Sequence, residues 1–210
     1  MDEYLSEAEQ WDLVKKWLRE NTVWLLAGVL IAVAGIFGWR WYQARVEAGL
    51  MAASGLYQQL TAAYEKRDQN EVTRLAAQLQ AEHAATGYAE DGQLAAARMY
   101  LENHQHALAI ETLSKLLGST RDAELALAVR LRIARIQIDQ GKADDALATL
   151  QGAASTGAYA PRYAEVRGDA LFAKGSGDEA LKAYQEALAA NSEAVDTELL
   201  KLKIAELSRS

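Results

Sequence analysis

An apolar run from Asn21 to Trp39 constrains this chain more than any other feature of its sequence, because its nineteen residues carry no formal charge. As an α-helix the run would be about 28 Å long, and the hydrocarbon core of a bilayer is about 30 Å thick. Nine of these residues are Val, Leu, Ile or Phe, and each favours insertion by about 0.3 to 0.6 kcal/mol. The core helix of a soluble domain rarely extends this far without a charge. The sequence therefore predicts a transmembrane helix over residues 23–42.

Aromatic residues mark both ends of the run. Indole and phenol rings prefer the headgroup boundary, where the body of the ring is in apolar surroundings and its polar edge stays wet. The predicted membrane-interface aromatics are Trp24, Trp39, Trp41 and Tyr42. Small residues also recur at a spacing of four, which lets helices approach closely in lipid. The helix-packing candidates are Gly28, Ala32, Ala34 and Gly38.

A cleaved signal peptide is the main alternative to an uncleaved anchor. Ala32-Val33-Ala34 has the small-x-small form of a cleavage site. Cleavage after Ala34 would leave the apolar residues up to Trp39 at the new terminus. The first 22 residues hold six acids against three bases, unlike a short basic leader. We therefore expect an uncleaved signal anchor.

The segment 1–22 is predicted to lie in the cytoplasm. Three Lys or Arg residues precede the apolar run and two, Arg40 and Arg45, follow it closely, and the side with more basic residues tends to stay inside. Residues 4–20 have apolar side chains at helical spacing, which predicts an amphipathic helix. Such a helix would dock on lipid or on a membrane partner, or would merely extend the anchor. The sequence leaves these alternatives open.

Residues 43–210 are predicted to form one all-α domain on the far side of the membrane. Alanine and leucine are abundant and Pro161 is the only proline, a composition that favours helix over strand. The chain has no cysteine, so disulfides and thiolate chemistry are excluded. A net charge of −7 argues against nucleic acid as a partner.

An internal repeat organises this domain. The stretch from Gly141 to Ala153 recurs at Gly175 to Ala187, at an offset of 34 residues and with six of thirteen positions identical. Each copy resembles a tetratricopeptide repeat: a small residue in a first helix, a turn glycine, an alanine early in a second helix, a large apolar residue and another alanine. These positions are Ala134, Gly141, Ala146, Leu150 and Ala153 in one unit and Gly168, Gly175, Ala180, Tyr184 and Ala187 in the next. The resemblance implies helical hairpins stacked into an α-solenoid.

More degenerate units surround these two. A third unit has Ala97 at the small position and His104 in place of the turn glycine. A poorer pair of helices is expected over 47–66 and 71–84. A terminal helix near 193–207 is expected to cap the stack, since it would have one apolar and one wet face, given by Leu199, Leu200, Lys203 and Leu207.

No motif for catalysis, cofactor binding or metal binding is found. His104 and His106 are two residues apart at a predicted turn and lack further ligands for a metal. Acidic pairs such as Asp144-Asp145 begin second helices, where they suit the helix dipole. We therefore expect a binding protein and not an enzyme.

The first helix of each hairpin lines the concave groove in tetratricopeptide folds, so the resemblance places candidate peptide-binding residues there. The candidates comprise a charged position after each small residue and an apolar row three residues further on. They are Arg98, Leu101, Arg135, Ile138, Asp169 and Phe172. An apolar row with charged neighbours suits extended polypeptide. The alternative is that the row only packs between hairpins.

The whole chain resembles the YfgM family. The resemblance rests on the acidic N-terminus, on the anchor ending in Gly38-Trp-Arg-Trp-Tyr-Gln43, and on local stretches such as Leu131-Arg-Ile-Ala-Arg135. It implies a bacterial inner-membrane protein with a cytoplasmic N-terminus and a periplasmic domain.

The same resemblance implies partners. They are the SecYEG translocon, the periplasmic chaperone PpiD, membrane lipid, and emerging or unfolded polypeptides that are passed to other chaperones. An inner-membrane assembly scaffold or stress-signalling regulator that binds one folded partner is the alternative function.

Overall fold

The computed structural model describes residues 7–190 and 192–208, and its regular structure in these ranges is entirely helical. The all-α fold class expected from composition is therefore confirmed for this part of the chain. The helices are α1 (Glu7–Glu65), α2 (Gln69–His83), α3 (Gly87–Glu102), α4 (His106–Ser119), α5 (Ala123–Asp139), α6 (Ala143–Gln151), α7 (Ala160–Ala173), α8 (Gly177–Ala189) and α9 (Thr197–Leu207), with a short 3-10 turn, η1 (Gly157–Tyr159), before α7.

The chain divides between Ala52 and Ala53 into two compact units. The first unit consists of the N-terminal part of α1, where the apolar run has no buried residues. Among the residues that the structure describes, α1 is the one helix long and apolar enough to cross a membrane. The predicted interface aromatics are exposed, and Trp24 is 78% accessible. Apart from the adjoining turns of α1 itself, no described residue comes within 4 Å of a methyl group added at Gly28 or Gly38, so helix packing there stays a prediction.

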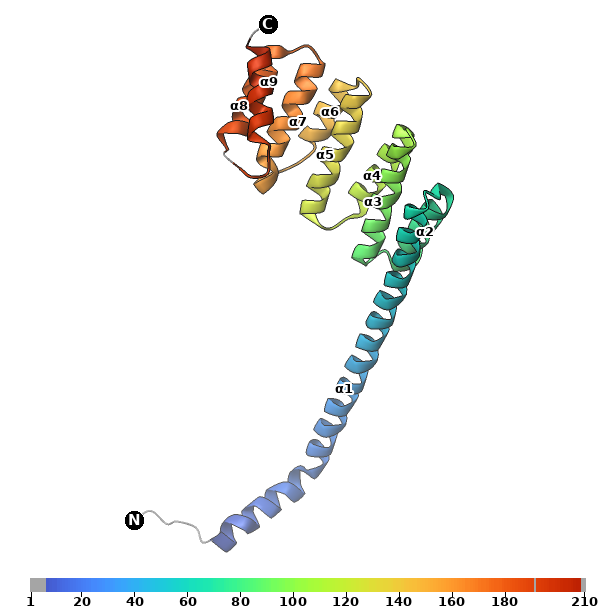
Figure 1. Ribbon diagram of the computed structural model, residues 1–210. Coiled ribbons are helices and arrows are strands. Elements are labelled where there is room, and N and C mark those ends of the chain that lie inside the picture. The colour runs from blue at the N-terminus through green and yellow to red at the C-terminus, as the bar shows by residue number, and fades with distance from the viewer. Residues whose placement is uncertain (1–6, 191, 209–210) are drawn as a thin grey trace, which may run out of the picture. The chain divides into compact units, whose positions relative to one another are not determined.

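The second unit is a stack of helical hairpins (Figure 1). Four hairpins follow one another, formed by α1 from Ala53 onward with α2, by α3 with α4, by α5 with α6, and by α7 with α8. Each buries an apolar face against its neighbours, as expected of a solenoid. The expected first helix at 47–66 does not begin separately, since α1 runs without a break from the anchor into this unit.

The four hairpin turns share one backbone geometry. The residue that leaves the first helix has a positive φ, of 57° at Arg67, 58° at His104, 73° at Gly141 and 84° at Gly175. Its N–H bonds to the carbonyl three residues back, and the next N–H bonds to the carbonyl five residues before it. This is the Schellman ending of a helix. The predicted equivalence of His104 with the turn glycines is confirmed, and Arg67 adds a fourth position.

The small and large positions of the repeat meet inside the last hairpin. A methyl group added at Gly168 would lie 2.5 Å from the Tyr184 ring, so only glycine lets that ring reach α7. Beyond this hairpin, α9 packs on α8 through the fully buried Leu200. Leu199 is 42% exposed, so it lies on the solvent side of this terminal helix. The helix begins at Thr197, after the Asp196 cap, and its packed side carries Leu200, Ile204 and Leu207 at helical spacing.

Candidate binding groove

A groove of about 770 Å³ opens among the first helices of three successive hairpins, and all of its residues belong to the second unit. One side comes from α1 after Ala53, the middle from α3, and the other side from α5. The lining residues are Tyr57, Leu60, Thr61, Tyr64, Asp91, Leu94, Ala95, Ala97, Arg98, Leu101, His106, Leu113, Arg132, Arg135, Ile136 and Asp139. Its surface combines aromatic and aliphatic side chains with charges of both signs.

The α1 side of the groove is held by a tyrosine bonded to α3. The Tyr64 hydroxyl donates to Glu102 Oε1 at 2.5 Å, and Arg98 Nε donates to the same oxygen at 3.1 Å. The Arg98 guanidinium also lies 5.7 Å from the centre of the Tyr64 ring, a cation–π distance. A second tyrosine, Tyr57, has its ring 5.7 Å from that of Tyr88. The aromatic side of the groove is therefore positioned before any ligand arrives.

These contacts shift the protonation of the groups involved. Burial raises the pKa of the Tyr64 phenol, and its hydrogen bond to Glu102 raises it further. The same hydrogen bond is the main cause that lowers the pKa of Glu102, with Arg98 adding to the effect. Burial, together with the nearby Asp91, also raises the pKa of Tyr57. At neutral pH the groove thus presents neutral phenols beside an ionised carboxylate.

The α5 side carries positive charge. Arg132 and Arg135 line the groove with exposed side chains, and neither has a hydrogen bond or ion pair with a residue that the structure describes. Arg98, by contrast, is engaged by Glu102. The acids in the lining are Asp91 and Asp139. Two guanidinium groups are therefore available to an incoming acidic group, and a planar guanidinium suits a carboxylate well.

The structure brings together three of the six candidate peptide-binding residues. Arg98, Leu101 and Arg135 all line the groove. Ile138 is half-buried and packs against the core cluster shared by α5, α6 and α7. Phe172 is 50% exposed at the end of α7 and lies outside the groove lining.

The remaining candidate, Asp169, is engaged within the domain. Its Oδ1 accepts from the Tyr184 hydroxyl at 2.8 Å and from Lys203 Nζ at 2.7 Å. Lys203 also lies 3.5 Å from Glu165 Oε1. These bonds tie α7, α8 and α9 together, so Asp169 has a structural partner on both α8 and α9.

Sequence reasoning missed the α1 side of the groove. Tyr64 precedes its turn residue by three positions, as Leu101 and Ile138 precede theirs. The signal was available, because the turn residues Arg67, His104 and Gly141 are spaced at 37 residues. It was hidden because neither of the first two is a glycine.

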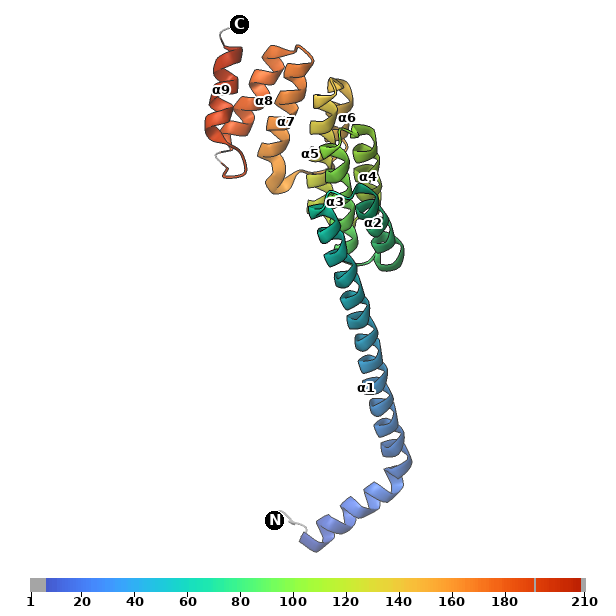
Figure 2. The same ribbon diagram turned by 45° about the vertical axis from the view of Figure 1, so that its right-hand side comes forward.

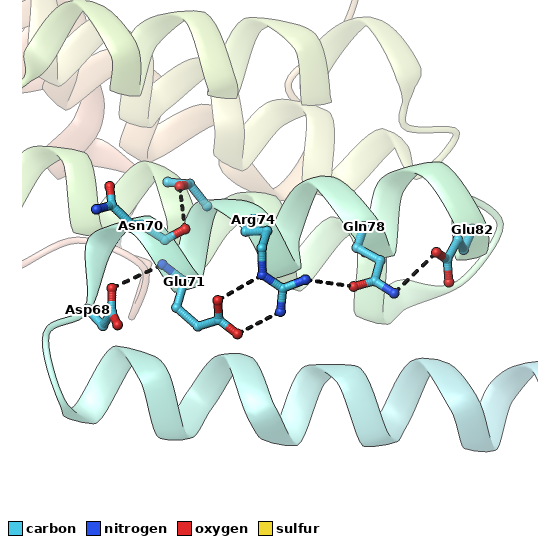
Figure 3. Close-up of polar contacts among 7 residues, drawn as sticks. Asp68, Asn70, Glu71, Arg74, Gln78 and Glu82 are labelled. Atoms are coloured by element: carbon cyan, nitrogen blue, oxygen red, sulfur yellow. Dashed lines mark hydrogen bonds and ion pairs between the residues drawn. The ribbon is translucent and has the colours of Figure 1, made fainter.

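The outer face of α2 has a different character. Asp68 caps the helix by accepting from the Glu71 N–H at 3.1 Å, and Glu71 receives two hydrogen bonds from Arg74. Figure 3 shows this chain of contacts continuing through Gln78 to Glu82. Such paired, exposed charges are typical of a solvated helix face. The groove, and not this face, is the candidate for binding.

Within the described residues, no group of three or more His, Asp or Glu side chains is placed to hold a metal ion. The groove histidine, His106, has a buried Nδ1 without a hydrogen-bond partner. It stands at the start of α4, and the His104 ring lies 6.4 Å from its own ring, centre to centre. Among the described residues no third metal-ligating group joins the two histidines.

Comparison with known proteins defines the class. The family model described as a tetratricopeptide repeat-like domain matches residues 15–209, so the chain belongs to that family. A crystal structure of a Podosopora anserina kinesin light chain with nearly identical TPR-like repeats superposes with a TM-score of 0.54 at 19% identity, covering 79% of this chain and 85% of the other. At that identity the likeness shows the fold alone, and it confirms the predicted solenoid.

Curated relatives are similar over nearly the whole chain. The ancillary SecYEG translocon subunit of Escherichia coli (strain K12) is 29% identical over 208 residues, which is 99% of this chain and 100% of the relative. Proteins with the same name from Neisseria gonorrhoeae and Aggregatibacter actinomycetemcomitans are 28% and 27% identical, over 97% and 95% of this chain and 98% and 97% of their own lengths. The resemblance expected from the sequence is thereby confirmed.

Proposed function

We propose that this chain is an ancillary subunit of the SecYEG translocon, held in the bacterial inner membrane by residues 23–42. Residues 1–22 stay in the cytoplasm and residues 43–210 form the periplasmic domain. The domain binds polypeptides as they emerge from the translocon and passes them to periplasmic chaperones such as PpiD. The association is supported by curated relatives that are named as translocon subunits and are similar to this chain over nearly its whole length. The function is binding, without catalysis.

The composition of the groove carries the proposal that it receives the polypeptide. An unfolded segment offers apolar side chains at intervals, and Tyr57, Leu94 and Leu101 supply matching surface. Rigid tyrosine rings give contact area at a small cost in side-chain entropy. Arg132 and Arg135 add attraction for acidic side chains without requiring a fixed sequence. A surface of this kind favours many related segments over one folded partner.

Site-specific photocrosslinking in growing cells tests the proposal. A photoreactive residue is placed at Tyr57 or Leu101 in the groove, and at Glu82 on the outer face of α2 as the matched control. We expect groove positions to form a ladder of adducts with many secreted chains, and the control to form none. One discrete adduct at the groove positions would favour a scaffold or stress-signalling regulator. Adducts of equal yield at Glu82 would refute the groove as the site.

A charge-reversal variant separates polypeptide binding from translocon association. Replacing both Arg132 and Arg135 by Glu should lower adduct yield at Leu101 several-fold, since the attraction for acidic segments becomes repulsion. Co-purification with the translocon in mild detergent should be unchanged. The matched control, with the same change of net charge, replaces both Arg121 and Lys142 by Glu, since both are exposed and lie outside the groove lining. An equal loss with the control would show that net charge alone, and not the groove, governs binding.

A further inference from the structure

The part of α1 before Asn21 exposes an unusual amount of apolar surface. Its large apolar side chains are about half exposed or more, and Trp11 reaches 65%. At 100° per residue they fall within one sector of about 160°. This sector holds Trp11, Leu13, Val14, Trp17 and Leu18. The opposite sector holds Asp12, Lys15, Lys16, Arg19 and Glu20.

If the apolar run crosses the bilayer, the segment before Asn21 must stay close to the membrane surface, because both belong to one continuous helix. Leu18 and Val23 are five residues apart on the same helix, about 7.5 Å along its axis. The exposed sector must therefore face water, another protein surface or the membrane boundary at the point where the chain enters. Trp11 and Trp17 suit the boundary, because indole rings prefer the headgroup region.

Two polar residues lie where this segment meets the apolar run. Asn21 Nδ2 donates to the Trp17 carbonyl at 2.9 Å, and Thr22 Oγ1 donates to the Leu18 carbonyl at 2.6 Å. Side chains that bond back to the preceding turn lengthen the helix bonds there and favour a bend. Figure 1 shows α1 bending within its N-terminal part, and Figure 2 shows the same bend from a second direction. The bonds also satisfy both side chains, so they can sit at the edge of the hydrocarbon.

We propose that residues 10–20 form an interfacial helix that lies along the membrane surface, with its apolar sector in the headgroup region of the leaflet where the chain enters. Lipid is the occupant of this face. The three basic residues lie in the opposite sector beside two acids, and Lys15 is 3.5 Å from Asp12, so attachment depends on buried apolar area more than on anionic lipid. The inference rests on the membrane span of the proposed function and on neither the translocon nor the groove.

The full chain allows a direct test because it contains no cysteine. Single cysteines at Val14 and Leu18 report the apolar sector, and those at Lys16 and Glu20 report the polar sector as matched controls. Each variant is spin-labelled and reconstituted into phosphatidylethanolamine–phosphatidylglycerol vesicles. We expect oxygen, which concentrates in lipid, to reach the labels at Val14 and Leu18 several-fold better than a water-soluble nickel complex does. The preference should be reversed at Lys16 and Glu20.

Two results would overturn the proposal. Equal access of the nickel complex to all four labels would place the segment in water. Labels at Val14 and Leu18 that are shielded from both reagents would place the face against protein, such as a second copy of the chain. A further label at Ile31, within the apolar run, separates the two hypotheses. If Ile31 is also in water, the membrane span of the proposed function fails; if Ile31 alone is in lipid, only the interfacial helix fails.

Discussion

The two halves of the helical domain share one repeat and fill it with different residues. In the first half, formed by α1 from Ala53 to α4, the positive-φ turn positions are Arg67 and His104. In the second half, from α5 to α9, they are Gly141 and Gly175. A positive φ lowers the stability of the folded chain by about 1 to 2 kcal/mol at a residue that has a Cβ atom, and glycine avoids this cost. The first half therefore accepts backbone strain that the second half avoids.

The halves also differ in the residue at the small position of the repeat. The small position of the repeat is Leu60 in the first hairpin and Gly168 in the last. The first half contributes most of the groove, whereas the second half closes around Tyr184 and Lys203. The difference indicates that the second half mainly stabilises the stack of helices, whereas the first half provides most of the groove surface.

Exchanging the residue at the small position should give the largest effect. Leu60 is fully buried in the first hairpin, but the variant Gly168→Leu would drive a side chain into the Tyr184 ring. We expect a loss of about 3 kcal/mol in the free energy of unfolding, the upper range for overpacking. Urea unfolding of the full chain in mild detergent, followed by circular dichroism, measures it. The control is Gly118→Leu, because nothing lies within 4 Å there; equal losses would show that the halves do not differ in packing.

Removing the charge that joins α9 to α7 should give the next largest effect. Lys203 has 24% of its side chain exposed and bonds to Asp169, with Glu165 nearby. Lys203→Met leaves two half-buried carboxylates without their cation, and we expect a loss of about 2 kcal/mol. Lys201→Met removes only an exposed pair with Glu198 and should cost less than about 1 kcal/mol. If both variants unfold at the same urea concentration, the second half is not held by this network.

The sequence predicted the second half better than the first, because the two halves have different residues at their turns. The second half was found through its glycines, since Gly141 and Gly175 mark the turns and expose the 34-residue offset. In the first half Arg67 has a positive φ, which is uncommon for arginine and cannot be predicted from the residue type. The α1 side of the groove was therefore missed. Asp169 shows the other limit. Its partner Lys203 is 34 residues away, and only the packed helices bring them together.

Relieving the backbone strain should give a smaller and opposite effect. His104→Gly removes the side chain from a positive-φ position, which stabilises the folded chain, but glycine also adds entropy to the unfolded chain. The net effect should be a rise of about 0.5 to 1 kcal/mol in the free energy of unfolding. Gly141→Ala, at the equivalent turn, should lower it by about 1 kcal/mol. The same unfolding measurement compares the two. A loss in both variants would mean that the His104 side chain makes a stabilising contact that outweighs the strain.

The smallest effect is expected for a change in the pKa of Glu102, which is bonded to the Tyr64 side of the groove. Tyr64→Phe removes the hydrogen bond that chiefly lowers the pKa of Glu102, so this pKa should rise toward its ordinary value. A carboxyl whose folded pKa is lowered contributes stability above its unfolded pKa and loses it as the pH falls through the folded value. The variant should therefore lose less stability on acidification than the parent chain does.

A carbon-detected NMR titration of the Glu102 carboxyl measures this shift directly. Glu71 serves as the control within the same sample, because Arg74, and not a tyrosine, lowers its pKa. An unchanged Glu102 with an unchanged Glu71 would mean that the Tyr64 hydroxyl does not donate in solution. The aromatic side of the groove would then be free to move, and the first half would differ from the second in order as well as in packing.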